Sequence, residues 1–220
     1  MVQFPSPNFG PRRDGAVPDI IVLHYTAMAD CDAAQRVLCT PEREVSAHYL
    51  IAPNGTVTQL VDEDQRAWHA GAGSWGSVTD VNSRSIGIEM SNIGTAPFSA
   101  PLMDALETLL PEIMNRWSIP PERVIGHSDM APGRKIDPGA RFDWTRLARQ
   151  GLAIRAQAQA PIAADQARFD TALTQIGYPT ADADTRLSAF RLRHRQGATG
   201  PLDAWDMALA TDLAARYPAT

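Results

Sequence analysis

The stretch GHSDMAPGRKID, residues 126–137, combines residue types that suit a metal site. His127 lies ten positions before Asp137, and Lys135 stands between them. Pro-Gly pairs occur within this stretch and directly after it, so its backbone is expected to fold back on itself. Such a loop can bring an imidazole nitrogen and a carboxylate oxygen to one point. These would be two of the three protein ligands that an open zinc site needs.

His24 is the first candidate for the third ligand, because it ends the apolar run IIVL of residues 20–23. Considered alone, a histidine on a strand is usually a packed core group or a surface group. Together with His127 and Asp137 it would supply two imidazoles and a carboxylate, and leave a fourth position for water. That composition is typical of a catalytic zinc site, whereas structural zinc sites are closed by four protein ligands. We therefore expect one Zn²⁺ per chain.

A zinc hydrolase also needs a group that moves protons, and Glu89 is the natural candidate. It interrupts the apolar stretch 86–90, and burial of a carboxylate costs free energy unless the carboxylate is paired or has a function. Lys135 could place a fixed positive charge beside a developing oxyanion. The alternatives are a solvent-facing strand position for Glu89 and a solvated loop lysine for Lys135.

Further histidine and tryptophan side chains could support such a site. His48 lies on an expected strand, where it could orient a metal-ligating side chain through a hydrogen bond or simply pack in the core. Trp68, His69 and Trp75 belong to a glycine-rich loop and could form one wall of a substrate groove. The alternative for the two tryptophans is that they anchor the core.

The elements that must position these residues alternate along the first 150 positions. Residues 1–18 are rich in Pro and Gly and suggest an irregular arm. The Asn54-Gly55 pair predicts a hairpin between two strands. Apolar runs and alternation predict strands at 19–26, 46–52, 56–61, 85–90 and 123–126, and helical spacing predicts helices at 32–38, from about 101 onward, and at 142–150.

Composition changes after this part of the chain. Residues 152–164 are rich in Ala and Gln and suggest a helical tail and linker. Short amphipathic segments follow near 165–176, 183–194 and 203–216, which predicts a small all-α unit of three helices. The expected division is therefore a catalytic domain at 1–151, a linker at 152–164 and a three-helix domain at 165–220.

Bulk properties exclude several classes of protein. The chain has 220 residues, of which 44% are hydrophobic and 20% charged, and this composition is typical of a globular protein. Its net charge of −5 argues against nucleic acid as a partner, because that binding depends on neutralising phosphates. No apolar run approaches the ~20 residues of a transmembrane helix. The N-terminus lacks the pattern of a signal peptide, so we expect a cytoplasmic protein, or a periplasmic one if a targeting segment has been removed.

Five segments resemble the zinc-dependent N-acetylmuramoyl-L-alanine amidases of the amidase-2 family, which is related to bacteriophage T7 lysozyme and to the peptidoglycan recognition proteins. Together the segments are highly specific, although no one of them would be. They run in the family's order: IVLHYT (21–26), VSAHYLI (45–51), RAWHAG (66–71), NSRSIGIE (82–89) and GHSDMAPGRKIDPG (126–139).

This resemblance implies an α/β fold, with a mixed β-sheet flanked by helices, and a role for each matching residue. His24, His127 and Asp137 would be the zinc ligands, Glu89 the general base and then the acid, and Lys135 the group that steadies the tetrahedral intermediate. The bond cut would join N-acetylmuramic acid to the L-alanine of a stem peptide. We expect further contacts with peptidoglycan or muropeptide substrate from His48, Trp68, His69, Trp75, Asn82 and Arg84.

The C-terminal segment resembles, more weakly, a three-helix peptidoglycan-binding domain. It departs from that pattern in the loop at 179–184, so it could bind glycan or only brace the catalytic domain. Two rival functions stay open: a muropeptide-binding module without catalysis, and an inhibitor or regulator of another protein. Recognition proteins of this fold that only bind typically lack a complete ligand trio, so the enzyme is favoured. We expect a monomer.

Overall fold

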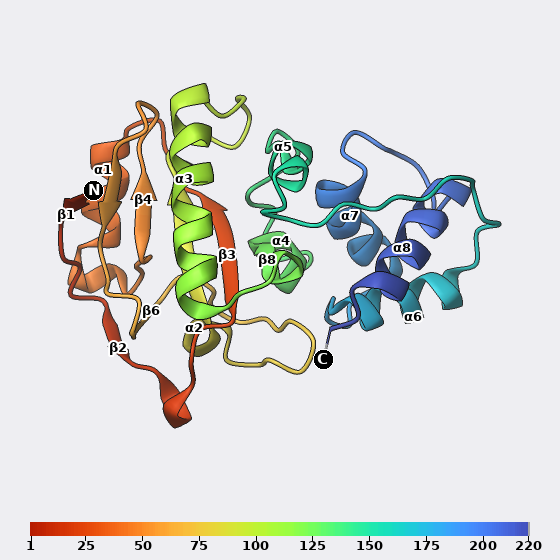
Figure 1. Cartoon of the computed structure of the whole chain (residues 1–220), viewed down its shortest axis with the longest axis horizontal. Coiled ribbons are helices and arrows are strands. Elements are labelled where there is room, and N and C mark those ends of the chain that lie inside the picture. The colour runs from red at the N-terminus through yellow and green to blue at the C-terminus, as the bar shows by residue number, and fades with distance from the viewer. Residues whose placement is uncertain (220) are drawn as a thin grey trace.

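A six-stranded mixed β-sheet forms the centre of the computed structural model, which describes residues 1–219 (Figure 1). The strand order is β1-β5-β4-β7-β3-β8. Strands β4, β7, β3 and β8 run parallel, whereas β5 is antiparallel to β4 and parallel to β1. A separate two-stranded sheet joins β2 to β6. The strand bounds are β1 Val2–Gln3, β2 Phe9–Pro11, β3 Ile20–Tyr25, β4 Tyr49–Ile51, β5 Val57–Gln59, β6 Gln65–Ala67, β7 Ser85–Met90 and β8 Val124–Gly126.

Helices cover both faces of this sheet, and α3 packs along one of them (Figure 1). The sheet and helices confirm the expected α/β fold. The helix bounds are α1 Cys31–Leu38, α2 Val81–Arg84, α3 Ala100–Trp117, α4 His127–Met130, α5 Trp144–Arg149, α6 Gln166–Ile176, α7 Ala183–His194 and α8 Ala204–Arg216, with short 3₁₀ turns at Arg13–Gly15, Pro41–Arg43 and Pro121–Arg123.

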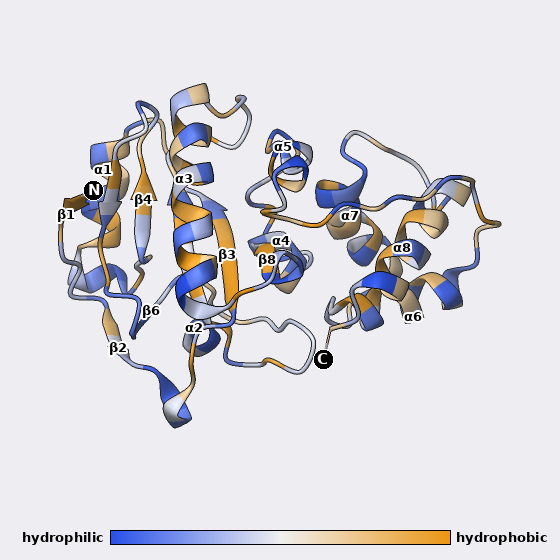
Figure 2. Ribbon diagram, in the orientation of Figure 1, coloured by the Kyte–Doolittle hydropathy of each residue, from blue (hydrophilic) through white to orange (hydrophobic). Residues whose placement is uncertain are grey.

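Strand β3 divides its side chains between two hydrophobic clusters. Ile21 and Leu23 pack into the cluster that α3 completes, whereas Ile20 and Val22 pack into the cluster built largely by the C-terminal helices. This alternation follows from the period of two in a strand. Because both faces are covered, the first four residues of the strand are all apolar, and Figure 2 shows most of β3, and β8, as apolar ribbons within the molecule.

Helices α6, α7 and α8 confirm the three helices expected at the C-terminal end. Their residues Phe169, Phe190 and Leu213 share one cluster with Ile20 and Val22 of the sheet. Thr220, the last residue of the predicted three-helix domain, lies outside the described residues. None of the helices within residues 1–219 combines the length and apolarity that a membrane crossing requires.

Two sequence-based expectations about irregular segments are wrong. Residues 1–18 include β1 and β2, which pair with β5 and β6. These strands have two and three residues, too few for alternation to reveal, and β2 ends on a proline that an edge strand tolerates. Residues 152–164 form no helix, and their backbone is held by contacts such as Ile162 N to Ala204 O at 3.0 Å.

Candidate active site

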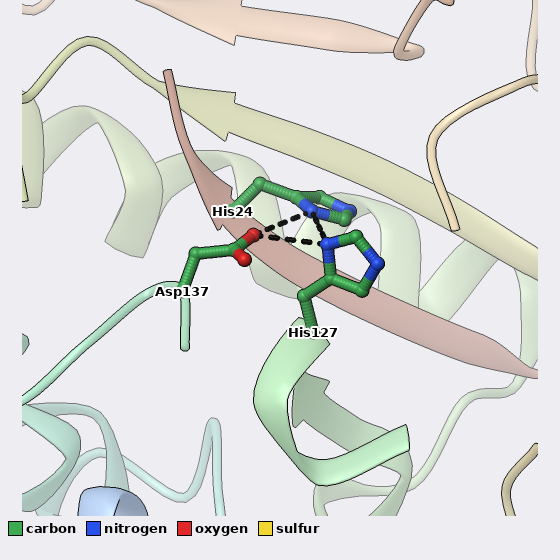
Figure 3. Close-up of side chains that lie close together, drawn as sticks. All are labelled: His24, His127 and Asp137. Carbon is green, nitrogen blue, oxygen red and sulfur yellow. Dashed lines mark hydrogen bonds and ion pairs between the residues drawn. The ribbon is translucent and has the colours of Figure 1, made fainter. Parts of the chain in front are cut away.

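Two histidines and one aspartate meet at the carboxyl ends of the parallel strands (Figure 3). His24 Nδ1 lies 2.9 Å from His127 Nδ1 and 2.9 Å from Asp137 Oδ2. The distance from His127 Nδ1 to Asp137 Oδ2 is 3.1 Å. All three side chains are buried, and they form a group that can hold a metal ion. The structure thus brings together the three residues that the sequence suggested as ligands.

Strand register and a closed loop produce this meeting. His24 of β3 is paired with Glu89 of β7, so both side chains leave the same face of the sheet. His127 follows β8 directly, on the other side of β3. The chain then returns to the site, because the Ser128 amide donates to the Asp137 carbonyl at 2.9 Å. The expected backward fold of residues 126–137 is therefore present.

A chain of hydrogen bonds fixes which nitrogen of His24 carries the proton. Ser85 Oγ lies 2.5 Å from the Val81 carbonyl, which can only accept, so the hydroxyl donates there. Ser85 Oγ then accepts from His69 Nε2 at 3.2 Å, which leaves His69 Nδ1 as an acceptor. His24 Nε2 lies 3.0 Å from this atom and must donate to it. The Nδ1 atom of His24 is therefore left with a free lone pair.

A backbone carbonyl fixes the proton of His127 on Nε2 in the same way. Its Nε2 lies 2.8 Å from the Ala70 oxygen and must donate to it, so its Nδ1 also carries a lone pair. The two Nδ1 lone pairs and an oxygen of Asp137 then face one another at hydrogen-bond distance. Such an arrangement is repulsive without a cation or a proton between the three atoms. The donor set therefore fits a metal ion, and the outer hydrogen bonds are those that metal-bound histidines usually make.

The surroundings of His24 and Asp137 favour the charge states that metal binding requires. Burial, followed by the proximity of His127, lowers the pKa of His24 to about 4. Burial alone would raise the pKa of Asp137, but the proximity of His127 and His24 holds it below its usual range. A neutral imidazole and an ionised carboxylate are the forms that bind metal ions.

Glu89 places an unpaired carboxylate oxygen beside this group. Its Oε2 is buried and has no hydrogen-bond partner within residues 1–219. Burial first, and then the charge of Asp137, raises the pKa of Glu89 to about 8, and the charge of Lys135 opposes this rise. A carboxyl group with a pKa near neutrality can both accept and release a proton at physiological pH. A buried carboxylate oxygen without a partner, next to a group that can hold a metal ion, makes Glu89 a candidate functional residue.

The site opens into a cavity of about 540 Å³. Its polar part includes the three candidate ligands, Glu89 and Lys135, and Lys135 is exposed to solvent. Trp68 and His69 also line the cavity, as expected for a groove wall. The apolar part of the lining comes mainly from the segment around α1: Met28, Ala34, Val37, Leu38 and Val45.

His48 and Asn82 lie behind the site and not on the cavity surface. His48 is fully buried, and its Nδ1 accepts from the Gly87 amide at 2.9 Å. Asn82 Oδ1 accepts from the amides of His69 and Ala70 at 3.1 and 2.8 Å. Both residues hold backbone in place, so the structure does not support the expected substrate contacts.

Trp75 and Arg84 also lie away from the cavity, which contradicts the roles expected from the sequence. Trp75 is 2% exposed and packs edge-to-face against Tyr178, with ring centroids 5.1 Å apart. Its ring is a core anchor, which was the alternative considered for it. Arg84 donates through Nε to Asp19 at 2.9 Å, near the start of β3. That ion pair lies at the opposite end of the strands from His24.

Sequence reasoning missed the contributions of α1, Ser85 and the Ala70 carbonyl. The apolar face of α1 was visible as helical spacing of Ala34, Val37 and Leu38, which could have suggested a wall. The roles of Ser85 and Ala70 depend on three-dimensional contacts between distant residues. No pattern of residue types signals them.

Comparisons with known proteins agree with this geometry. The family model for N-acetylmuramoyl-L-alanine amidases, Amidase_2, matches residues 14–140. The N-acetylmuramoyl-L-alanine amidase AmiD of Escherichia coli K12 is 40% identical over 156 residues, which are 64% of this chain and 55% of that relative. The chain therefore spans little more than half the length of this relative.

Solved structures match over more of the chain. The complex of Escherichia coli AmiD with anhydro-N-acetylmuramic acid-L-Ala-D-γ-Glu-L-Lys has a TM-score of 0.84 and 34% identity, and the match covers 93% of this chain and 92% of that one. AmpDh3 of Pseudomonas aeruginosa, in complex with anhydromuramic pentapeptide, has a TM-score of 0.83 and 31% identity, with coverage of 94% and 95%. The family match, the fold and the ligand group agree, and this chain belongs to the N-acetylmuramoyl-L-alanine amidase family.

Proposed function

We propose that this chain is a zinc-dependent amidase that hydrolyses the bond between N-acetylmuramic acid and the L-alanine of a stem peptide. The observation that carries this proposal is the convergence of three lone-pair atoms beside an unpaired buried carboxylate, at the base of one cavity. His24, His127 and Asp137 would hold the metal. Two nitrogens and one oxygen are a ligand set typical of catalytic zinc.

The chain's own residues supply the proton transfers and the charge. When bound, zinc supplies Lewis-acid chemistry, which makes water a better nucleophile and polarises an amide carbonyl. Glu89 accepts a proton from the attacking water and then donates it to the leaving amine of L-alanine. Lys135, at the edge of the same cavity, offers a positive charge to the oxyanion that forms at the carbonyl.

The substrate class is supported by the ligands named for two similar proteins. AmiD was solved with an anhydro-N-acetylmuramyl tripeptide and AmpDh3 with an anhydromuramic pentapeptide. A cavity of about 540 Å³ falls within the usual range for small-molecule sites. We therefore propose soluble anhydro-muropeptides as substrates and treat intact peptidoglycan as the alternative.

Product analysis tests both parts of this proposal. The purified protein is incubated with anhydro-N-acetylmuramyl-L-Ala-D-γ-Glu-L-Lys or with intact sacculi, and products are identified by mass spectrometry. We expect a free tripeptide with an L-alanine amino terminus, formed faster from the soluble substrate. Tight binding of the muropeptide without any cleavage by the zinc-loaded protein would instead support a binding module.

A further inference from the structure

We propose that the C-terminal helices strengthen metal binding through a buried brace formed by Asp129, Tyr178 and Arg193. The brace positions the segment that carries His127, a role that presupposes the metal centre proposed above. It joins α4, the turn after α6, and α7, which lie next to one another in Figure 1.

Asp129 is the centre of the brace. It lies two residues after His127 in α4 and is 0% exposed. Its carboxylate accepts from the Gly126 amide at 2.8 Å, from the Tyr178 hydroxyl at 2.6 Å and from Arg193 Nη1 at 2.9 Å. A buried carboxylate is tolerated only when such donors compensate it, so its orientation is fixed by them. Two of the three donors come from the C-terminal part of the chain.

Arg193 also holds the strand that leads to His127. Its Nη2 donates to the Val124 carbonyl at 2.8 Å, so that this one side chain joins α7 to both β8 and α4. The guanidinium lies over the Trp144 ring, 4.5 Å from the centroid, and Arg193 is 5% exposed. A planar, stacked guanidinium with two bonded nitrogens is a rigid connection.

The turn after α6 contacts the loop that follows Ala70, the residue whose carbonyl oxygen pairs with His127. The Gly76 amide donates to the Gly177 carbonyl at 2.8 Å, and Trp75 packs edge-to-face on Tyr178. The loop that contains Trp75 and Gly76 begins just after Ala70, whose carbonyl accepts from the Nε2 atom of the ligand histidine. The C-terminal helices therefore contact both segments that orient this imidazole.

The test compares three single variants of the full-length protein. Tyr178→Phe removes one hydroxyl from the brace, and Arg193→Lys removes the planar two-point contact. Arg191→Lys is the matched control, because Arg191 lies on the same helix and forms a comparable buried pair with Asp206, away from α4. Zinc affinity is measured by competition with a chelator, and hydrolysis is measured at saturating zinc.

We expect Tyr178→Phe and Arg193→Lys to lower zinc affinity by about tenfold, the lower end of the effect of losing a direct partner of a metal ligand, because both act on His127 through Asp129. Arg191→Lys should bind zinc like the wild type, and Tyr178→Phe should recover the wild-type rate when zinc is saturating. Unchanged affinity in Tyr178→Phe, or an equal loss in Arg191→Lys, would overturn the brace while the amidase function stands. A wild-type protein that binds no zinc would instead refute the proposed function, and the brace with it.

Discussion

Glu89 performs the proton transfers in this account, and its surroundings explain why a carboxylate is retained there. The oxygen Oε2 is buried without a protein partner, which costs stability that a glutamine or an apolar residue would not cost to the same degree. The proposed role in proton transfer explains why a carboxylate stands there. Its raised pKa, about 8, suits a residue that must gain and lose a proton in each turnover.

Glu89→Gln should therefore separate chemistry from metal binding. Turnover should fall by a factor on the order of 10²–10⁴, because the amide side chain cannot accept the proton of water. Zinc content, measured by elemental analysis, should stay at the wild-type level, since Glu89 is not among the three converging ligand atoms. Glu112→Gln, an exposed position on α3, is the control and should leave turnover unchanged. A wild-type rate in Glu89→Gln would mean that another group moves the proton.

Ser85 is small, but it determines the tautomer of His24, a proposed ligand two hydrogen bonds away. In Ser85→Ala, His69 loses its fixed acceptor and can carry its proton on Nδ1 instead. His24 would then have to place its own proton on Nδ1, where it competes with the metal. We expect zinc affinity to fall by about tenfold, the lower end of the effect of outer partners.

The control for this prediction is Ser91→Ala. Ser91 is buried just beyond the end of β7, and its hydroxyl lies outside the chain of hydrogen bonds that ends at Val81. Chelator competition should give this variant the affinity of the wild type. If Ser85→Ala also matched the wild type, the tautomer of His24 would not depend on Ser85.

At the scale of elements, long apolar strands were predictable and short ones were not. The strand expected at 85–90 has the bounds of β7, and 19–26 contains β3, because six consecutive strand residues buried on both faces leave a clear pattern. The register that brings His24 beside Glu89 is not visible in either segment alone. It follows from pairing between residues 65 positions apart, for which a single sequence carries no signal.

The N-terminal arm illustrates what the sequence concealed. Arg12, just after β2, donates to backbone carbonyls of Glu63, Ser83 and Ser85 at 2.7 to 3.2 Å. Burial lowers the pKa of Arg12 to about 10, although the guanidinium stays charged at neutral pH. An arginine in a Pro- and Gly-rich arm resembles a solvated loop residue until these acceptors are known.

Arg12→Ala should lower the free energy of unfolding by roughly 2–4 kcal/mol, because several part-buried carbonyls lose their donor. Arg13→Ala is the neighbouring control. The Arg13 side chain is 68% exposed and pairs with Asp80 at 3.5 Å, so its loss should change stability by less than about 0.5 kcal/mol. Urea unfolding of both variants measures the difference, and equal midpoints would refute a structural role for the arm.

At the scale of the whole molecule, the protein contains buried histidines in both of its halves. Burial is the first cause of a lowered pKa for His24, about 4, and for His48, about 3, and it places the pKa of His69 and His194 well below the usual 6.5. The unfolded chain binds protons at these positions below pH 6.5, whereas the folded chain does not. Their stabilisation is therefore complete above pH 6.5 and is lost as the pH falls toward their folded pKa values. Glu89 has the opposite effect on stability, because its raised pKa makes the folded state less stable as the pH rises from its ordinary pKa to about 8. This single group opposes four histidines.

The metal-free protein should consequently melt at a lower temperature at about pH 5 than at about pH 7, as measured by circular dichroism. His194→Leu should reduce this difference, because it removes one partly buried imidazole that packs on Phe190 and lies outside the ligand group. A difference as large as that of the wild type would show that His194 is already protonated in the folded protein.

The division into domains at 1–151 and 165–220 stays a prediction, because the apolar residues of both parts share one cluster. The sequence indicated three C-terminal helices from their spacing, but the contacts of Tyr178 and Arg193 with Asp129 join residues at least 49 positions apart. Such contacts depend on how the helices dock on the sheet. No local pattern in either segment encodes them.

Zinc titration of the metal-free protein, with cleavage of an anhydro-muropeptide as the readout, tests the central claim most directly. The rate should rise in proportion to added zinc and level off at one equivalent per chain, and His24→Ala should show no such rise. Cleavage by the metal-free protein at the full rate, or a zinc-loaded wild type that releases no L-alanine amino terminus, would contradict the account.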